Sequence, residues 1–390
     1  MSTNLKISFC IPLKNNLRYF KKCFESIKKY CDVQYEIVCY IDSDNDGTEQ
    51  YLIDNNIKYE KNKSDICKGI AYGYNRCVCL SKYDIVLFFH ADMILGPNAI
   101  SNALKYLKEK TVVSLTRIEP PLHPEGMEKI VKDFGFWPES DVKDGFKETE
   151  FVNYVLTYSD SNKITNGIFA PWMIYKKNIL NIGMHDELFH SYHEDSDIFN
   201  RFILSEYELI QSWNALVYHL TCRGGQFQDG LSVTKDPIFH QMKKNCANNY
   251  LRKWKSWIKN DEFNRPILSP IYNIGVIIKN CTPSLVPHIE PWFSTVYTDC
   301  NVNEYINSEQ THTPFNLKQK FKSLNEEKTN DVIVEFDANL LNNDRYQFLT
   351  SHLPHVLNES GQIGEMEYDI FRFNIKSLNR YEKDLIKTIN

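Results

Sequence analysis

The feature that most constrains the fold is an alternation of short apolar runs with helical patterns in the first part of the chain. The apolar runs predict strands, because they are short and rich in β-branched and aromatic residues. They lie at 7–13, 36–41, 57–62, 84–93 and 111–118. Helices are expected between them, at 16–30, 48–55, 66–82 and 98–109. This order favours a mostly parallel sheet with helices on both faces, which binds ligands at the carboxyl ends of its strands.

The alternation stops at 119–165, where prolines, glycines, acids and aromatic residues are mixed. We expect an insertion over one face of the sheet, because long ordered loops in compact domains are more often functional than idle. Strand-like sequence resumes at 164–180. A helix is then expected over 194–210, where Ile198 and Phe202 have helical spacing.

The remainder of the chain predicts a second, smaller α/β domain. An amphipathic helix with a lysine-rich face is expected over 239–259, and its pattern is typical both of a docking helix and of a membrane-surface helix. Apolar runs and a helical pattern over 344–357 follow it. We expect a first domain over 1–235, a helical connector over 236–265 and a C-terminal domain over 266–390, in which no catalytic constellation is visible.

Composition narrows the functional classes. The formal net charge of −5 gives no basic field over the whole molecule, so nucleic acid is not an expected partner. The 11 cysteines lack the paired spacing of zinc sites and are expected to be mostly buried, reduced thiols. No apolar run approaches the roughly 20 residues of a membrane span, and none resembles a secretory signal. We expect a soluble, cytoplasmic protein, with peripheral membrane association left open.

Acidic residues collect in "IDSDNDG", where the second expected strand ends. Asp42, Asp44 and Asp46 match the opening of an EF-hand calcium loop, but Ile53 occupies the position of its closing glutamate. Calcium is therefore not expected. These acids could instead face a ligand, or Asp44 and Asp46 could form an Asx turn and a helix cap.

Two other strand ends carry residues of interest. The first strand ends in "IPLKNN" with Pro12, and the fourth ends in "FFHADM" with His90, Ala91 and Asp92. The carboxyl ends of parallel strands lie along one edge of a sheet. The acidic turn, His90 and Asp92 are therefore expected to line a single cleft.

Seven segments, taken in order, resemble the nucleotide-sugar-dependent glycosyltransferases of the GT-A fold, particularly family 2. They are "ISFCIPLKNN", "IDSDNDGT", "KGIAYGYNRCV", "FFHADM", "NGIFAPWMI", "HEDSD" and "VYHLTCRGG". The similarity covers roughly residues 5–230, and it depends on the order and spacing of the segments because no single motif is specific. It implies a GT-A fold, which is a Rossmann-like, mostly parallel sheet flanked by helices.

The resemblance implies a donor pocket formed by the residues Pro12, Asp42, Asp44, Lys68, Asn75, His90, Ala91 and Arg223. Asp42 would receive the base, because a buried uracil N–H needs an acceptor, so a UDP-sugar is the expected donor. Lys68 could reach a phosphate, and Arg223 could close on the diphosphate. Asn75 could contact the ribose or order the loop. For Lys68 and Asn75 the alternative is a helix surface residue.

The resemblance also implies a metal site. "HAD" lies where the family has its D-x-D motif, and this chain departs from the motif by placing His90 at the first acidic position. Asp92 aligns with the acid that touches the metal, and His219 aligns with a histidine that completes coordination in several relatives. Mg²⁺ or Mn²⁺ would bridge the carboxylate and the diphosphate, and imidazole favours Mn²⁺. A structural histidine is the alternative for His219.

"HEDSD" resembles the family's E-D motif, which implies that Asp195 is the catalytic base, with Glu194 as the second candidate. Capping of the following helix better suits Asp197. On the acceptor side, Trp172 could stack on a sugar ring beside Asn166, although an aromatic residue in a strand is as often part of the core.

The expected function is a metal-dependent, inverting transfer of a sugar from a nucleoside diphosphate, with UDP favoured, to a glycan, protein or small-molecule acceptor. The insertion would help to form the acceptor pocket, and the C-terminal domain would cover it, recruit a partner or mediate homo-oligomerisation. One alternative is a catalytically inactive nucleotide-sugar-binding module, which His90 suggests. Another is a nucleotidyltransferase, although "PLKNNLRY" lacks the glycine-rich phosphate loop of that class.

Overall fold

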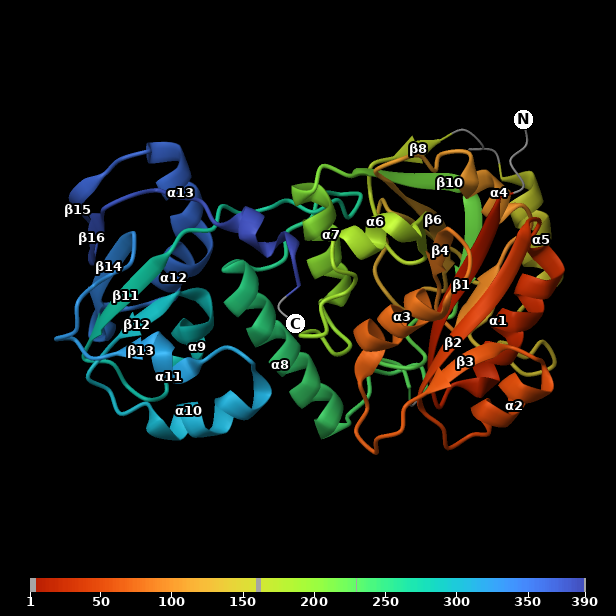
Figure 1. Ribbon diagram of the computed structural model, residues 1–390, viewed down its shortest axis with the longest axis horizontal. Coiled ribbons are helices and arrows are strands. Elements are labelled where there is room, and N and C mark those ends of the chain that lie inside the picture. Colours follow the sequence, from red (N-terminus) through yellow and green to blue (C-terminus); the bar gives the residue numbers. More distant parts are fainter. Residues whose placement is uncertain (1–4, 159–162, 229, 389–390) are drawn as a thin grey trace. The chain divides into compact units, whose positions relative to one another are not determined.

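The computed structural model describes residues 5–158, 163–228 and 230–388 (Figure 1). The chain divides into two compact units. The first unit comprises Met1–His240 and Asn260–Pro266, and the second comprises Gln241–Lys259 and Ile267–Asn390. The expected connector is thus divided between the units, since residues on both sides of His240 belong to one continuous helix, α8 (Pro237–Trp254).

The first unit contains a large mixed sheet with the strand order β3-β2-β1-β4-β9-β6-β10-β5, in which β7 pairs with β6 and β8 with β10. Its strands are β1 (Lys6–Lys14), β2 (Gln34–Ser43), β3 (Lys58–Lys61), β4 (Ile85–Phe88), β5 (Met93–Leu95), β6 (Thr111–Glu119), β7 (Lys129–Val131), β8 (Ile164–Thr165), β9 (Trp172–Tyr175) and β10 (Glu208–His219). The strands β1 to β4 pair in parallel, whereas β9 runs antiparallel to β4 and β6. The expected α/β fold with a mostly parallel sheet is confirmed.

Helices of the first unit alternate with these strands (Figure 1). They are α1 (Leu17–Tyr30), α2 (Thr48–Asp54), α3 (Gly69–Leu80), α4 (Ala99–Leu104), α5 (Glu148–Thr157), α6 (Lys176–Asn181) and α7 (Glu194–Leu204). The prediction of one helix over 194–210 is wrong after Leu204. Glu206 adopts a φ of 60°, which ends the helix, and the apolar residues that follow form β10 instead.

The strand expected over 84–93 is also divided. β4 ends at Phe88, and β5 begins at Met93 as an antiparallel partner of β10. Between them the chain turns, with the Met93 N–H donating to the His90 carbonyl at 3.2 Å. The "HAD" sequence therefore lies in a turn between two differently oriented strands.

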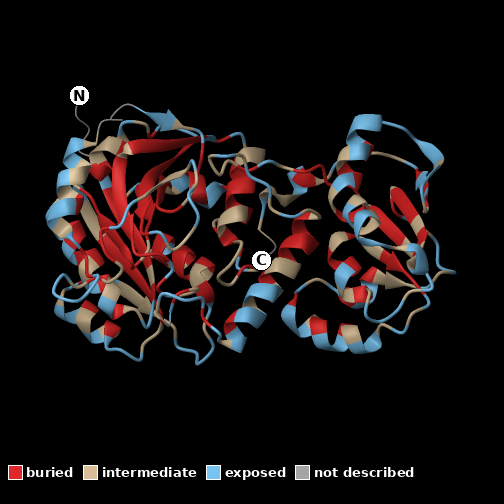
Figure 2. Cartoon of the chain, turned by 180° about the vertical axis from the view of Figure 1, so that it is seen from behind, coloured by how far each residue is buried: buried red, intermediate tan, exposed pale blue. Residues whose placement is uncertain are grey.

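The central strands of this sheet are buried on both faces, as expected where helices cover a parallel sheet. Neither β4 nor β6 has an exposed residue. Figure 2 shows the buried residues concentrated in the strands of the sheet. The segment expected as an insertion carries β7, α5 and β8, and its Phe134, Phe146 and Phe151 form an apolar cluster with Tyr218 of β10.

The second unit has a smaller sheet with the strand order β13-β12-β11-β14-β16-β15. Its strands are β11 (Ile274–Lys279), β12 (Thr295–Tyr297), β13 (Phe321–Lys322), β14 (Val332–Asp337), β15 (Gly364–Tyr368) and β16 (Phe371–Ile375). β11 to β14 pair in parallel and β16 pairs antiparallel to β14, which repeats the arrangement β3-β2-β1-β4-β9 of the first unit.

Helices of the second unit are short. They are α9 (Val286–Ile289), α10 (Asn303–Glu309), α11 (Leu317–Lys320), α12 (Asn343–Gln347) and α13 (Leu353–Ser360). The helix expected over 344–357 is interrupted by a π-helical segment, Phe348–His352, between α12 and α13.

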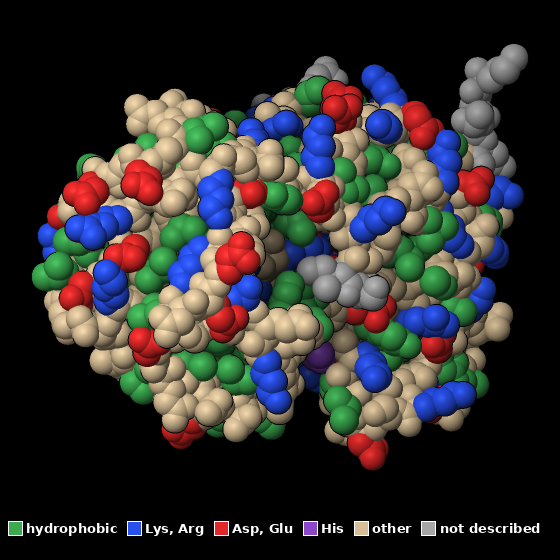
Figure 3. All heavy atoms as spheres, turned by 60° about the vertical axis from the view of Figure 1, so that its left-hand side comes forward, with side chains coloured by type: hydrophobic (Ala, Val, Ile, Leu, Met, Phe, Trp, Pro, Cys, Tyr) green, Lys and Arg blue, Asp and Glu red, His purple; other side chains and the backbone are tan. Residues whose placement is uncertain are grey.

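Helix α8 contributes a buried charge cluster to the second unit. Arg252 donates to Glu290 and Glu309 at 2.7 Å each, and Glu290 also pairs with Lys320. These partners leave little uncompensated charge in the interior. No described helix is both long and apolar enough to cross a membrane. On the face drawn in Figure 3, basic and acidic side chains are interspersed.

Candidate active site

The side chains of His90, Asp92 and His219 converge at the carboxyl edge of the first unit's sheet. One ligand atom of each lies within 4.8 Å of the others. His90 and Asp92 come from the turn after β4, and His219 is the last residue of β10. The two segments meet because β5 pairs antiparallel with β10, with Met93 opposite His219.

A buried carboxylate orients His219. Its Nδ1 lies 2.8 Å from Glu119 Oε1, so Nε2 faces Asp92 Oδ1 at 3.6 Å. Within the described chain Nε2 is buried and has no hydrogen-bond partner. Burial lowers the pKa of His219, but the charge of Asp92 and the hydrogen bond and charge of Glu119 outweigh burial and raise it to about 9. The surroundings of Nε2 therefore favour a positive charge.

Backbone groups hold Asp92 in place. The Arg223 N–H donates to Asp92 Oδ2 at 2.8 Å, and the Leu220 N–H donates to the Asp92 carbonyl at 2.9 Å. Burial raises the pKa of Asp92, but His219, His90 and the Arg223 N–H together hold it well below its ordinary value. Asp92 is thus an ionised carboxylate at neutral pH.

The Arg223 side chain lies apart from this contact. Its guanidinium donates to the carbonyls of Gly230 at 2.6 Å and Phe136 at 2.7 Å, and it lies 5.0 Å from the centre of the Trp137 ring. Arg223 therefore joins two loops through its side chain and touches the Asp92 carboxylate through its backbone. Its expected contact with a diphosphate stays a prediction.

The residues at this point fit a hard divalent cation. They supply one ionised carboxylate oxygen, the unpartnered Nε2 of His219 and the imidazole of His90, whose pKa burial lowers to about 4. Neutral imidazole and carboxylate suit Mn²⁺ well and leave coordination positions for substrate oxygens. In the part of the chain that the structure describes, this is the single group of three or more potential ligands.

The acidic turn caps helices. Asp42 accepts hydrogen bonds from the N–H groups of Lys68 at 2.7 Å and Gly69 at 3.0 Å, at the start of α3. Asp44 accepts from the N–H groups of Thr48 at 2.8 Å and Glu49 at 3.2 Å, at the start of α2. Carboxylates stabilise helix N-termini through these bonds and through the helix dipole.

Asp46 belongs to the same turn and accepts from the Leu17 N–H at 2.8 Å, at the start of α1. The structure therefore contains the capping alternative for Asp44, at the helix that was expected, whereas Asp46 caps α1 instead of α2. Pro12 of β1 lies beside α3, since a Cβ added to Gly73 would lie 2.9 Å from the Pro12 side chain. Ala91 is 3% exposed.

Helix α3 holds the segment that leads into α7. The Asn75 side chain donates to the His185 carbonyl at 2.9 Å and accepts from the His185 N–H at 3.0 Å. The loop-ordering alternative for Asn75 is thus the one that its contacts favour. At the start of α3, the Ile70 N–H donates to the His190 carbonyl at 2.7 Å. A Cβ on Gly69 would lie 2.0 Å from that carbonyl oxygen, so only glycine fits there.

Glu194 and Asp195 form the first turn of α7, after His193 with a φ of 70°. Burial and the charge of Asp195 raise the pKa of Glu194 well above its ordinary value. Burial also raises the pKa of Asp195, to about 6, although Arg117 opposes the shift. Both carboxyl groups of this buried pair therefore ionise less readily than ordinary carboxyl groups. Asp197, by contrast, is fully buried in an ion pair with Arg201 at 2.8 Å.

The expected stacking of Trp172 on a sugar is wrong. The ring is 1% exposed and lies 4.0 Å from the Phe88 ring centre, so neither of its faces can reach a ligand at the surface. Trp172 also packs against Phe199 and Phe202 of α7 and thereby supports the helix that carries the acidic pair. Asn166 is exposed, in the turn after β8.

Sequence reasoning missed Glu119 and Arg117. Glu119 accepts from His219, from Arg117 at 3.0 Å and from Lys129 at 3.0 Å, and it is 2% exposed. A signal was present, because Arg117 and Glu119 lie two residues apart and thus on one face of an otherwise uncharged strand. Charged residues in such a position are almost never buried without partners.

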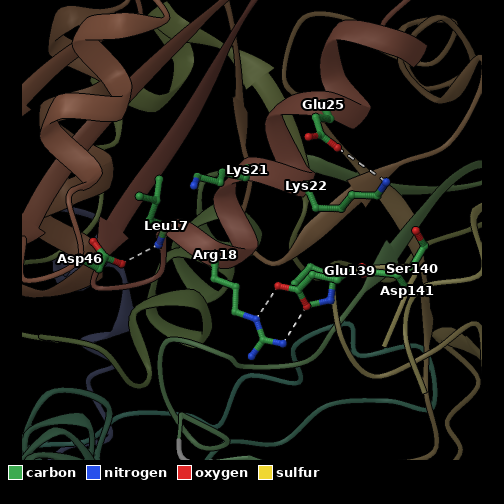
Figure 4. A pocket seen from close by; sticks show the side chains of 10 residues that line it. Leu17, Arg18, Lys21, Lys22, Glu25, Asp46, Glu139, Ser140 and Asp141 are labelled. Carbon is green, nitrogen blue, oxygen red and sulfur yellow. Dashed lines mark hydrogen bonds and ion pairs between the residues drawn. The ribbon is translucent and has the colours of Figure 1, made fainter. Parts of the chain in front are cut away.

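A separate hollow of about 570 Å³ lies between α1 and the loop 138–141 (Figure 4). Arg18 crosses it to pair with Glu139 at 2.7 Å, and Lys21 also lines it. Of the candidate residues above, only Asp46 borders it. This hollow is therefore distinct from the cation site.

Comparisons with known proteins agree on a class of enzyme. Residues 8–162 match the sequence model of Glycosyl transferase family 2. The chain is 23% identical over 225 residues to the uncharacterized glycosyltransferase YfnE of Bacillus subtilis (strain 168). The matched region covers 47% of this chain and 56% of that protein. The chain thus spans about half the length of the curated relative that it matches.

Solved structures with partial similarity include the following two. S. aureus TarS has a TM-score of 0.41 at 14% identity, covering 63% of this chain and 44% of that chain. GalNAc-T7, solved with UDP, GalNAc and Mn²⁺, has a TM-score of 0.41 at 12% identity, covering 56% of this chain and 44% of that chain.

Proposed function

We propose that this chain, a member of glycosyltransferase family 2 with a GT-A fold, is a metal-dependent enzyme that transfers a sugar from a nucleoside diphosphate to an acceptor hydroxyl with inversion. One observation carries the proposal. The ligand atoms of His90, Asp92 and His219 converge within 4.8 Å at the carboxyl edge of the sheet. A further observation supports it, because α7 begins with two buried acidic residues, Glu194 and Asp195, and the pKa of each is raised.

His90, Asp92 and His219 would hold Mn²⁺ or Mg²⁺. When bound, the cation would neutralise the charge that develops on the departing nucleoside diphosphate. The ionised Asp92 carboxylate supplies the negative charge of the site, and Glu119 fixes the His219 ring so that Nε2 points at the ion.

Asp195 is the base in this proposal. A base must be ionised at working pH and must accept the proton of the acceptor hydroxyl as that oxygen attacks the anomeric carbon. The pKa of Asp195, raised to about 6, meets this requirement at neutral pH, whereas burial and the charge of Asp195 raise the pKa of Glu194 well above its ordinary value. A single displacement with one base on the acceptor side inverts the anomeric configuration.

The donor pocket would lie beside the Asp42 turn. The two Asp42 oxygens accept N–H groups of α3, yet a carboxylate oxygen has a further lone pair for a uracil N–H. The same bonds fix the position of the carboxylate, and Lys68 is adjacent for a phosphate. We propose UDP as the nucleotide because Asp42 can accept the uracil N–H and because the acidic turn resembles the nucleoside-binding turn of the family.

For the acceptor we propose only a chemical class, and for the second unit only a kind of role. A glycan, a protein or a small molecule with a free hydroxyl would enter from the side of the segment 119–165, near Asn166. The second unit would recruit a partner, cover the acceptor or mediate homo-oligomerisation.

The test is a screen of nucleoside diphosphate sugars with Mn²⁺ that measures the release of nucleoside diphosphate. We expect turnover of at least one UDP-sugar, loss of turnover on chelation, and a loss of about 100-fold or more for Asp195→Asn. Asp141→Asn, which removes an exposed carboxylate, is the matched control.

Other outcomes favour the alternatives. Calorimetric binding of the donor with Mn²⁺ but without any hydrolysis or transfer would favour an inactive binding module. Pyrophosphate released from a nucleoside triphosphate and a sugar phosphate would favour a nucleotidyltransferase.

A further inference from the structure

Arg117 is a buried cation near the carboxyl end of β6, and its guanidinium meets two different partners. Through its N–H groups, it donates from Nη1 to Glu119 Oε1 at 3.0 Å. Through its flat face, it lies over the Phe169 ring, with 3.8 Å between the guanidinium carbon and the ring centre. Arg117 is 6% exposed, so we expect it to act through these neighbours and not by touching a substrate.

The first contact fixes the carboxylate that orients His219. Glu119 Oε1 accepts from Arg117 and lies 2.8 Å from His219 Nδ1, while Oε2 accepts from Lys129 at 3.0 Å. A rotation of this carboxylate would therefore break several bonds at once. Because Glu119 turns Nε2 of His219 toward Asp92, short contacts connect Arg117 to the proposed cation site.

The second contact holds a segment that lies at the same edge of the sheet. Phe169 comes three residues before Trp172, the first residue of β9, which pairs with Phe88 at the carboxyl end of β4. The Leu115 N–H donates to the Pro171 carbonyl at 2.9 Å, so the segment also runs beside β6. The Phe169 ring is therefore held where β4 and β6 end, and the turn that carries the cation ligands follows β4.

The Phe169 ring differs from its aromatic neighbours because part of it reaches the surface. Trp172, Phe88 and Tyr74 are each at most 2% exposed, whereas Phe169 is partly exposed. The Arg117 guanidinium covers one face of the ring. Sugar rings present a face of C–H groups, and the negative face of an aromatic ring attracts such groups. Phe169 can therefore offer the sugar contact that the buried Trp172 cannot.

We propose that Arg117 is a positioning residue that couples the cation site to sugar binding: it holds Glu119 in place for His219, and it supports the Phe169 ring as a platform for the sugar of the donor. The inference rests on the proposed function, in which the diphosphate binds the cation and the attached sugar lies beside it. Arginine suits both tasks, because a planar guanidinium can donate along its rim while it stacks through its face. A lysine ammonium is a point charge and has no such face.

Phe169→Leu tests the platform. The measurements are Mn²⁺-dependent release of UDP from the UDP-sugar that the donor screen selects, and calorimetric binding of UDP and of Mn²⁺. We expect the KM for the UDP-sugar to rise about 5- to 20-fold, because the stacking contact is lost. The dissociation constants of UDP and of Mn²⁺ should not change, because neither probe carries the sugar. Phe169→Tyr keeps a ring over Arg117 and should lose less than Phe169→Leu.

Arg117→Lys separates the two contacts of the arginine. Lysine keeps a charge beside Glu119, so the Mn²⁺ dissociation constant should change by less than about threefold, while the KM for the UDP-sugar rises as in Phe169→Leu. Combining Arg117→Lys with Phe169→Leu should raise KM little further, since both changes remove one interaction. Arg117→Met also removes the charge and should weaken Mn²⁺ binding about 10-fold or more.

Arg76→Lys is the matched control. Arg76 also donates to a glutamate through its planar fork, with 2.7 Å between Nη2 and Glu60 Oε2, but it belongs to α3 and its partner to β3. This variant should leave the KM for the UDP-sugar and the Mn²⁺ dissociation constant unchanged. UDP binding verifies that each variant is folded.

The possible failures are distinct. If the wild-type protein releases no nucleoside diphosphate from any donor, the proposed function fails and the coupling fails with it. If the wild-type protein turns over and Phe169→Leu has the same KM, only the platform is overturned. If Arg117→Lys loses affinity for Mn²⁺, UDP and the UDP-sugar to the same extent, Arg117 supports only the fold and the coupling is overturned.

Discussion

His219 and Glu119 meet through Nδ1 and Oε1 at 2.8 Å, and both side chains are almost fully buried. The contact fixes which nitrogen of His219 carries the proton toward Glu119, so the other nitrogen faces Asp92. Carboxylates that receive the second N–H of a metal-binding imidazole tune both its orientation and its basicity. The pair therefore determines how well the proposed cation site is preformed.

Glu119→Gln should weaken Mn²⁺ binding by about 10- to 100-fold, because the amide orients His219 less strongly and carries no charge. Isothermal titration with Mn²⁺ measures the change. Glu128→Gln is a suitable control, since Glu128 is a neighbouring acid that contacts Arg117 at 3.5 Å and does not contact His219. Equal Mn²⁺ affinity in wild type and Glu119→Gln would contradict the role of Glu119.

His90→Asp restores the usual acidic position of the D-x-D motif and should change metal preference. Imidazole favours Mn²⁺ over Mg²⁺, whereas a carboxylate accommodates both ions. We expect the ratio of Mn²⁺-supported to Mg²⁺-supported turnover to fall severalfold in this variant. Assays at saturating concentrations of each ion give the ratio, and an unchanged ratio would remove His90 from the set of ligands.

The pH dependence of turnover should follow Asp195. Burial raises its pKa to about 6, and a general base works only when it is ionised. We therefore expect kcat/KM to rise with pH through about 6 and to level off above about 7. A profile at constant ionic strength and saturating Mn²⁺ tests this. An acidic limb centred near the ordinary pKa of an aspartate would argue against Asp195 as the base.

Asp195→Asn should stabilise the fold while it abolishes turnover. A carboxyl group whose pKa is raised on folding binds its proton more tightly in the folded state, so its ionisation destabilises the fold as pH rises from the unfolded pKa to about 6. The penalty is then constant at higher pH. We expect a gain of about 1 to 3 kcal/mol at pH near 8 and almost none at pH near 4.

Denaturant unfolding of the wild type and of Asp195→Asn at both pH values measures this difference. A stability loss at pH near 8 would show that the carboxylate contributes a favourable native contact, and the assigned environment of Asp195 would then be incorrect.

Gly69→Ala should disturb the contact between α3 and the segment leading into α7. Gly69 has a φ of 87°, and an added Cβ would lie 2.0 Å from the His190 carbonyl oxygen. Gly47 offers a matched control, because its φ is 83° and an added Cβ would meet nothing within 4 Å. We expect Gly47→Ala to cost about 1 kcal/mol for backbone strain and Gly69→Ala to cost at least about 2 kcal/mol more.

Thermal and denaturant melts of the two glycine variants give the comparison. Equal destabilisation would mean that the His190 segment can move aside at no cost, and the proposed coupling of α3 to the acidic pair would then be weak.

Much of the fold and part of the site follow from local sequence. The period of apolar residues is a local property, so the strands from Lys6 to Ser43 and the helices between them are visible without coordinates. Strand ends of a parallel sheet share one edge, and from this general rule we predict that Asp92 and the acidic turn lie along the same edge. The acidic pair at 194–195 is likewise recognisable from the resemblance of "HEDSD" to the family's E-D motif.

Other features depend on partners that are distant in the chain. Local sequence does not reveal that the fourth strand stops at Phe88, that Trp172 faces the core, or that the acids after β2 cap three helices. Each outcome depends on which hydrogen-bond donor or aromatic ring lies opposite the side chain. Groups that form a hydrogen bond or pack together are close in space but can be far apart in the sequence.

Amino-acid order alone therefore predicts the α/β alternation, the resemblance to a glycosyltransferase family and the candidate residues for the chemistry. The three-dimensional packing decides which atoms of those residues face one another and which groups surround them. It brings Glu119 to His219 across 100 positions, places the Tyr74 ring between two imidazoles, and buries Glu194 and Asp195 so that the pKa of each is raised. The physical reason is that burial and close charges set ionisation and orientation, and both arise only when distant segments meet.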